Sequence, residues 1–142
     1  MFSLKFTRLF ALFIATIMLV PTAFAYKAEE GRAIQPRYNE IFSFTVNFDI
    51  SSAGLASCYS SAETNLSSYS IDLNMQLQRS SNGRTWSTIR EWSSQKIQIT
   101  SVDKTYYVSP GYDYRIHVTA TVTNSSGRVV ETATRDSSIV SY

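Results

Sequence analysis

The chain has 142 residues, of which 13 are Lys or Arg and 11 are Asp or Glu. Its single cysteine and single histidine exclude an internal disulfide and a zinc site of the usual four-ligand kind. No acidic run has the spacing of a calcium-binding loop, so neither a metal nor any other cofactor is expected.

The first 25 residues have the pattern of a signal peptide. Two basic residues precede an apolar run from Leu9 to Val20, which is too short to span a hydrocarbon layer of ~30 Å as a helix. Ala23 and Ala25 occupy the small-residue positions that precede a cleavage site. We therefore expect cleavage after Ala25 and secretion of a chain that begins at Tyr26. An uncleaved membrane anchor is the alternative.

Removal of this leader takes away two basic residues and no acidic ones, so the secreted chain carries 11 of each. A neutral chain has no electrostatic footprint for nucleic acid or for an anionic membrane surface. Neither is therefore expected as a partner.

Residues 26–38 are polar and unpatterned, and they predict a flexible N-terminal arm. From residue 39 to residue 142, apolar and polar residues alternate with a period of two, which is typical of half-buried strands. We expect strands near residues 41–51, 55–61, 69–79, 84–92, 96–101, 104–108, 112–123 and 128–136. Seven or eight short strands in one domain, residues 39–142, predict an all-β fold, an antiparallel two-sheet sandwich.

The pair Asn82-Gly83 lies between two alternating segments and predicts a hairpin with a type I′ turn, in which both central residues have positive φ. Downstream, Trp86 and Trp92 share one parity while Ile89 has the other, so we expect a bulge or a strand end near residues 88–89. We also expect Trp86 to be buried and Trp92 to be partly exposed, because one tryptophan of such a pair usually packs in the core. Two sugar-stacking platforms are the alternative.

Cys58 alternates with Ala56 and is expected to point inward from the second strand, with Tyr59 outside. A buried, inert thiol is a common state for a free cysteine. The alternative is an intermolecular disulfide through Cys58, which would join two copies of an otherwise monomeric protein.

The segment VSPGYDYRIHVTATVTNSSG, residues 108–127, resembles the end of a fibronectin type III domain. The matching positions are Val108, Pro110, Gly111, Tyr114, Ile116, Val118, Ala120, Asn124 and Gly127. The resemblance implies an immunoglobulin-like or type III-like sandwich with a tyrosine corner, in which the Tyr114 hydroxyl bonds back to the preceding turn. It also implies that Cys58 faces the strand of Tyr114. The second expected strand lacks the tryptophan usual in these domains, which leaves the strand order open.

Three further patterns lie in the hairpin Leu77–Trp86, the strand Gly111–Arg115 and the hairpin Ser126–Glu131. Together they make the chain similar to small secreted proteins of Gram-positive bacteria that form a family with no assigned function. This resemblance implies a location outside the cell and no particular activity.

No residues are expected to be catalytic. His117 should lie on the solvent side of its strand and Cys58 on the inner side of another, so a nucleophile–base pair would have to reach across a sheet. The candidate binding surface is a polar stripe on the strand of residues 112–123, extended by the hairpin. Its residues are Arg84, Trp92, Asp113, Arg115, His117 and Thr119, and an ordinary solvated sheet face is the alternative.

These observations favour a secreted, non-enzymatic β-sandwich module that binds a cell-wall glycan or another protein. Two alternatives from other classes stay open. One is a small secreted hydrolase whose carboxylate pair assembles in space. The other is a secreted effector or toxin-like protein.

Overall fold

The computed structural model describes residues 38–142. The predicted signal peptide and residues 26–37 of the predicted arm lie outside the described residues. Tyr38, the last residue of that arm, packs against the core, with its ring 6.1 Å from the ring of Phe44. Within the described part of the chain, no helix is long and apolar enough to cross a membrane.

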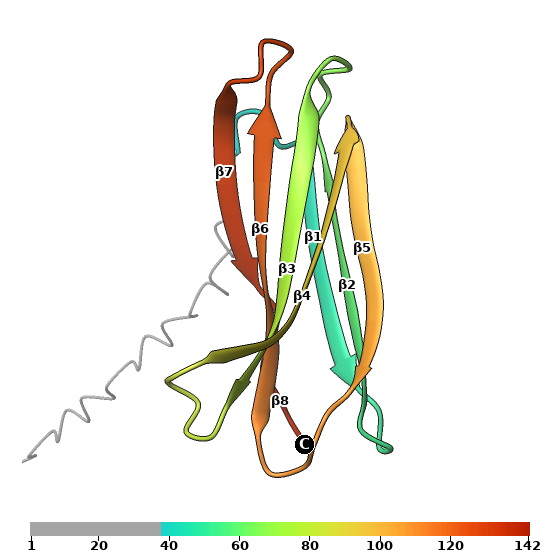
Figure 1. Ribbon diagram of the computed structural model, residues 1–142, viewed down its shortest axis with the longest axis vertical. Coiled ribbons are helices and arrows are strands. Elements are labelled where there is room, and N and C mark those ends of the chain that lie inside the picture. The colour runs from blue at the N-terminus through green and yellow to red at the C-terminus, as the bar shows by residue number, and fades with distance from the viewer. Residues whose placement is uncertain (1–37) are drawn as a thin grey trace, which may run out of the picture. The chain divides into compact units, whose positions relative to one another are not determined.

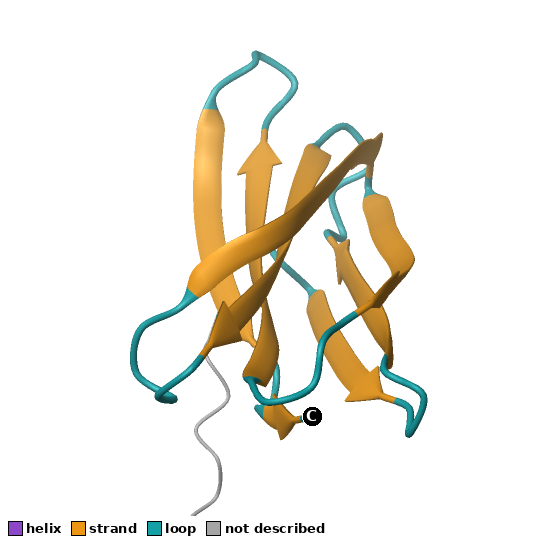
Figure 2. Ribbon diagram, turned by 60° about the horizontal axis from the view of Figure 1, so that its bottom comes forward, coloured by secondary structure: helices purple, strands orange, loops and turns teal. Residues whose placement is uncertain are grey.

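Residues 38–142 form eight strands in two antiparallel sheets (Figures 1 and 2). One sheet has the order β1-β2-β5, and the other has the order β4-β3-β6-β7, with β8 paired to β6. The predicted all-β sandwich is confirmed. The strands are β1 (Ser43–Ile50), β2 (Leu55–Glu63), β3 (Ser70–Ser80), β4 (Ser87–Ile97), β5 (Ile99–Tyr107), β6 (Asp113–Thr123), β7 (Val129–Asp136) and β8 (Val140–Ser141).

The sequence left the strand order open, and the pairing of β4 determines it. In constant-type immunoglobulin domains the fourth strand joins the sheet of the first two strands, whereas β4 pairs with β3 here. Figure 2 shows β4 crossing obliquely from the β3–β4 loop to the start of β5. The first, second and fifth strands therefore face the third, fourth, sixth and seventh.

The core lies between the sheets and follows the predicted alternation. From β3, the side chains of Ile71, Leu73, Met75 and Leu77 are fully buried, and β6 contributes a matching row from Tyr114 to Val122. On each strand the intervening residues are polar and more exposed. A period of two places every second side chain on one face of a strand, so burial of the apolar row fixes the register.

Between residues 84 and 108 the structure has two long strands where the sequence predicted three shorter ones. β4 and β5 are separated only by Gln98, which has a φ of 68°. The backbone N–H of Gln98 donates to Tyr69 and its carbonyl accepts from Thr64, at 2.9 Å each. These two bonds hold the chain at the point where it passes from one sheet to the other.

The hairpin of Asn82-Gly83 exists, but the predicted type I′ turn is wrong. Only Gly83 has a positive φ, of 68°, and residues 81–86 form a longer loop between β3 and β4. The Asn82 carboxamide oxygen accepts from the backbone N–H groups of Arg84 and Thr85, at 2.9 Å each. Side-chain hydrogen bonds of this kind replace the backbone turn.

The tyrosine corner is confirmed. Tyr114 is 1% exposed, and its hydroxyl donates to the Ser109 carbonyl at 2.6 Å. Burial raises the pKa of this phenol above its ordinary value. The bond ties the start of β6 to the loop that follows β5.

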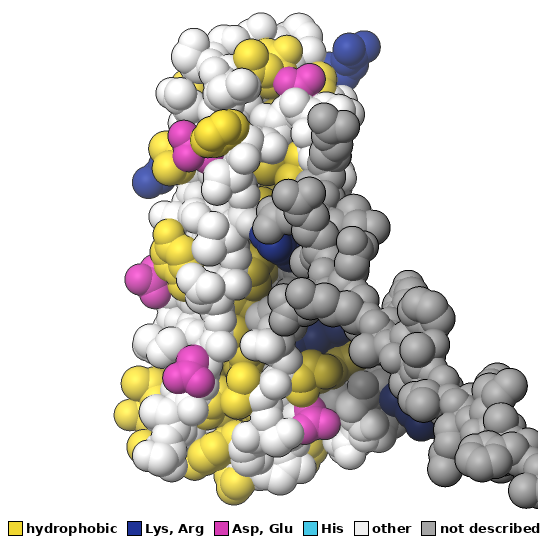
Figure 3. Space-filling view, turned by 180° about the vertical axis from the view of Figure 1, so that it is seen from behind, with side chains coloured by type: hydrophobic (Ala, Val, Ile, Leu, Met, Phe, Trp, Pro, Cys, Tyr) yellow, Lys and Arg dark blue, Asp and Glu magenta, His cyan; other side chains and the backbone are white. Residues whose placement is uncertain are grey.

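Hydrophobic atoms also gather at the lower end of the domain, as Figure 3 shows. Tyr107, the last residue of β5, and Ile139, directly before β8, are exposed there. Tyr142 packs over Gly54, where an added Cβ would lie 2.9 Å from the tyrosine ring. The missing side chain of Gly54 therefore lets Tyr142 close this end of the sandwich.

Glu131 on β7 holds the segment that leads into β1. Its carboxylate accepts three backbone N–H bonds, from Asn39 at 2.9 Å, Glu40 at 2.7 Å and Ile41 at 2.8 Å. We expect Glu131→Ala to lower the free energy of unfolding by about 2 kcal/mol. Hydrogen bonds to charged groups contribute roughly 1.5–3 kcal/mol each, and the variant loses the carboxylate that accepts all three.

Hydrogen exchange at the Glu40 and Ile41 amides measures the local effect, and chemical denaturation measures the global one. Thr132→Ala, at an exposed neighbouring position on β7, is the control and should change neither. Unchanged exchange at both amides in Glu131→Ala would show that the carboxylate does not hold this segment.

Candidate functional site

The outer face of the five-stranded sheet carries the polar stripe of β6. The outward side chains of β6 lie between those of β3 and β7, because β6 pairs with both strands. Gln78 is opposite Arg115, Gln76 is opposite His117, and Asp136 pairs with His117 from the other side. Directly opposed side chains on one face of an antiparallel pair are close enough to interact. The site therefore extends across three strands.

A hydrogen-bonded cluster centres on Arg115 and Asp136. Arg115 donates from Nη1 to Asp136 Oδ2 at 2.8 Å and from Nε to Gln78 Oε1 at 2.9 Å. The other Asp136 oxygen lies 2.5 Å from His117 Nδ1. Gln78 donates to Gln76 at 3.2 Å and so continues the chain of bonds along β3. These contacts fix the side chains of three strands relative to one another.

Trp86 completes this cluster. The sequence predicted that it would be buried, and this prediction is wrong. The guanidinium carbon of Arg115 lies 4.4 Å from the centre of the Trp86 ring, within the range of a cation–π contact. The side chain is half exposed and is not among the residues that pack on the core. Arg115 thus holds the indole at the edge of the polar face.

The predicted bulge explains why the two tryptophans differ. Leu77 pairs with Arg90 but Gln78 pairs with Thr88, so Ile89 is the extra residue and the bulge is confirmed. An extra residue inverts the alternation of side chains along a strand. Trp92 therefore pairs with Met75 and packs on the core, while Trp86 emerges on the opposite side, beside Arg115. Partial exposure of Trp92 is confirmed.

The structure brings together four of the six predicted site residues. Asp113, Arg115, His117 and Thr119 are half exposed on the outward side of β6. Arg84 lies exposed in the β3–β4 loop. Trp92 is on the other side of β4 and does not belong to this face.

Asp136, Gln78 and Gln76 belong to the cluster but were not among the predicted site residues. Each of them joins the cluster through cross-strand pairing, which depends on the register of β6 against its neighbours. Alternation along β3 put both glutamines on its polar side. Nothing in the sequence indicated which residue of β7 would lie opposite His117.

Asp136 orients the His117 imidazole. In enzymes with an activated nucleophile, a carboxylate can orient the histidine that acts as the base in the same way. In residues 38–142, however, no hydroxyl or thiol side chain is hydrogen-bonded to this ring. Cys58 is fully buried on β2 of the other sheet. No three of the described His, Cys, Asp and Glu residues are placed to hold a metal ion.

The cluster can instead present a fixed set of donors and acceptors next to an aromatic ring. No family model matches the chain, and no curated protein matches its sequence.

Proposed function

We propose that the protein is a secreted, non-enzymatic binding module that holds a neutral glycan on the outer face of its five-stranded sheet. The observation that carries this proposal is the position of Arg115, which contacts Trp86, Gln78 and Asp136 at the same time. An aromatic ring next to fixed polar groups is the arrangement by which proteins hold polar ligands of defined shape.

The electrostatics of the face support an uncharged ligand. The positive charge of Arg115 is paired with Asp136, and both side chains are partly withdrawn from solvent, with 21% and 41% exposed. Around them are the amides and hydroxyls of Gln76, Asn74 and Thr119, together with the Glu91 carboxylate, which accepts from Asn74 at 2.6 Å. This carboxylate disfavours an anionic ligand. Amide and hydroxyl groups both donate and accept hydrogen bonds, as the hydroxyl groups of a sugar require.

The leader pattern of residues 1–25 supports an extracellular setting, where cell-wall glycans are the abundant polymers. Another protein is the alternative partner for a flat polar face. A protein partner would show itself as retention on cell-surface protein and none on glycan.

Binding to peptidoglycan from which anionic polymers have been removed, together with an array of neutral glycans, tests this proposal. We expect Trp86→Ala and Arg115→Gln to lower retention at least about tenfold, because each removes one side of the aromatic and polar contact. The melting temperature should fall only slightly in Trp86→Ala, since Trp86 is half exposed and outside the core.

Thr121→Ala is the matched control, because Thr121 is on the same side of β6 but is not a partner in the hydrogen bonds that Arg115 makes with Gln78 and Asp136. It should bind as the unmodified protein does. Equal retention of all three variants, or no retention of the unmodified protein on any glycan, would refute the proposal.

A further inference from the structure

The hydrogen bonds of the outer face have a fixed direction. Arginine carries only donors and an ionised carboxylate carries only acceptors, so Arg115 and Asp136 determine how the side chains bonded to them are oriented. One series of bonds runs from Arg115 through Gln78 to Gln76, and a second bond joins Asp136 to His117. The groups left over at Gln76 and at His117 are those that a ligand meets.

The first series leaves the carboxamide N–H groups of Gln76 as donors. Arg115 Nε donates to Gln78 Oε1 at 2.9 Å, so the Gln78 nitrogen is the atom that donates to Gln76 Oε1, at 3.2 Å. The Thr88 hydroxyl on β4 donates to the same Gln76 oxygen at 3.2 Å. Both bonds use the oxygen, and no hydrogen bond within residues 38–142 uses the Gln76 side-chain nitrogen.

The bond to Asp136 leaves the Nε2 atom of His117 as an acceptor. Asp136 Oδ1 lies 2.5 Å from Nδ1 and can only accept, so the proton of a neutral imidazole is on Nδ1. Nε2 then carries a lone pair, and no donor in the described part of the chain is bonded to it. The His117 side chain is 32% exposed, so this atom can be reached by a ligand.

Register places this donor and this acceptor next to each other, since Gln76 pairs directly with His117 across β3 and β6. Directly opposed side chains on one face of an antiparallel pair lie within reach of the same small group. Their other bonds direct Gln76 toward Thr88 on β4 and His117 toward Asp136 on β7. A ligand group between them therefore meets a donor on one side and an acceptor on the other.

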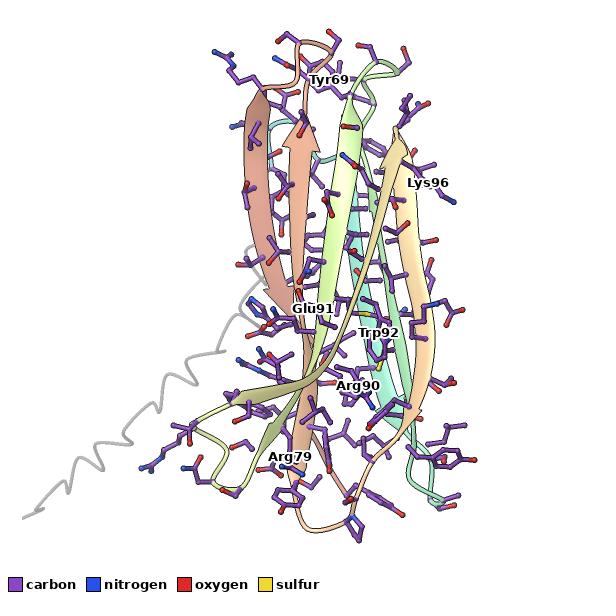
Figure 4. The ribbon with its side chains drawn as sticks, viewed as in Figure 1. Tyr69, Arg79, Arg90, Glu91, Trp92 and Lys96 are labelled. Atoms are coloured by element: carbon purple, nitrogen blue, oxygen red, sulfur yellow. The ribbon has the colours of Figure 1, made fainter. Side chains whose placement is uncertain are left out.

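The carboxylate of Glu91 limits the charge of this ligand group. Glu91 pairs with Gln76 across β3 and β4, and its carboxylate accepts from Asn74 at 2.6 Å. Figure 4 shows Glu91 and Trp92 on opposite sides of β4, with Trp92 toward β5. The negative charge of Glu91 disfavours an anionic group, and the N–H donors of Gln76 disfavour a cationic one. The group that fits between Gln76 and His117 is therefore uncharged.

We propose that the outer face recognises an N-acetylated amino sugar, whose acetamido carbonyl accepts from Gln76 and whose acetamido N–H donates to His117 Nε2. A secondary amide is neutral, and its planar trans geometry holds one acceptor and one donor on opposite sides. A sugar hydroxyl has both on a single atom and matches the pair less well. This inference rests on the proposed function and names the class of sugar that the site selects.

Two neutral oligosaccharides that differ only in the acetamido group test the inference. Fully N-acetylated chitotriose carries this group where cellotriose carries a hydroxyl. At about pH 8, where histidine side chains are in general neutral, chitotriose should bind at least about tenfold more tightly than cellotriose. The reason is that a site with a fixed donor and acceptor rejects an analogue that leaves them unpaired. Isothermal titration calorimetry measures both affinities.

Two variants each remove one partner of the acetamido group and keep the bonds within the cluster. Gln76→Glu retains the oxygen that accepts from Gln78 but replaces the donor nitrogen by an acceptor. His117→Asn retains a donor for Asp136 but has no atom at the position of Nε2. Each should reduce the preference for chitotriose over cellotriose to about twofold or less. Gln95→Glu is the matched control, because it makes the same chemical change at an exposed position of β4, and it should leave the preference unchanged.

Equal affinities for the two oligosaccharides, with retention still lost in Trp86→Ala, would overturn this inference and leave the proposed function standing. A preference that Gln76→Glu and Gln95→Glu reduce to the same extent would also overturn it, because the added charge and not the lost donor would then be the cause. Failure of the proposed function differs from both results, since in that case no neutral glycan is retained at all.

Discussion

Replacement of Tyr114 by alanine is expected to lower the free energy of unfolding by about 3–5 kcal/mol, the usual cost of removing a large buried aromatic side chain. Tyr114 is among the largest fully buried side chains of the described domain and is 1% exposed. A domain of this size has a total stability of about 5–15 kcal/mol. The variant should therefore be marginally folded at room temperature and should unfold at a much lower urea concentration.

Tyr114→Phe separates the ring from the hydroxyl. It keeps the buried volume and removes only the 2.6 Å bond to the Ser109 carbonyl, so we expect a loss of about 1–2 kcal/mol. Tyr112→Phe is the matched control, since Tyr112 is half exposed and contacts Tyr114 edge to face. A Tyr114→Phe variant as stable as the unmodified protein would mean that the corner bond contributes nothing net.

The fold was largely predictable because burial of one face imposes a period of two on each strand. Alternation in residues 71–77 and 114–122 was sufficient to identify the central strands β3 and β6 and the core rows that they contribute. The tyrosine corner was predictable for a different reason. It was implied by the resemblance of residues 108–127 to the end of a fibronectin type III domain, and the structure contains the expected bond from Tyr114 to Ser109.

The junction between β4 and β5 was not predictable in this way. Turns are recognised by glycine, proline and asparagine, and Gln98 has no intrinsic preference for its φ of 68°. Tertiary context supplies this conformation through the hydrogen bonds to Thr64 and Tyr69. A break of this kind leaves no signal in the residue type itself.

The candidate site was predictable only within single strands. The polar stripe of β6 followed from alternation, but Asp136 joins it through a register that the sequence does not specify. The exposure of Trp86 could have been inferred from the predicted bulge. The bulge near Ile89 was expected, and its consequence is that residues before and after it face opposite sides of the sheet.

Stability at alkaline pH is expected to fall steeply because of Cys58. The thiol is fully buried on β2, and desolvation together with the nearby charge of Asp103 raises its pKa from 9.0 to about 12. In the unfolded chain the thiol ionises near its ordinary pKa of about 8.5–9. Between these two values the folded state therefore binds more protons than the unfolded state.

The sign of the effect follows from proton linkage. Stability decreases with pH wherever the folded state binds the additional proton, by about 1.4 kcal/mol for each pH unit. The contribution of Cys58 is complete below about pH 9 and is lost as the pH rises toward 12. The total loss over this window should be about 4 kcal/mol at most.

Cys58→Ala isolates the thiol, because both proteins retain Tyr114, whose raised pKa also makes stability fall at high pH. Urea denaturation at a series of pH values should give a steeper decline for the unmodified protein than for Cys58→Ala. Labelling by a thiol reagent at pH 8 should be slow and should accelerate only when the domain opens, since a buried thiol is inert toward reagents and toward a second chain. Rapid labelling of the folded monomer, or parallel pH profiles for the two proteins, would contradict the buried, protonated state of Cys58.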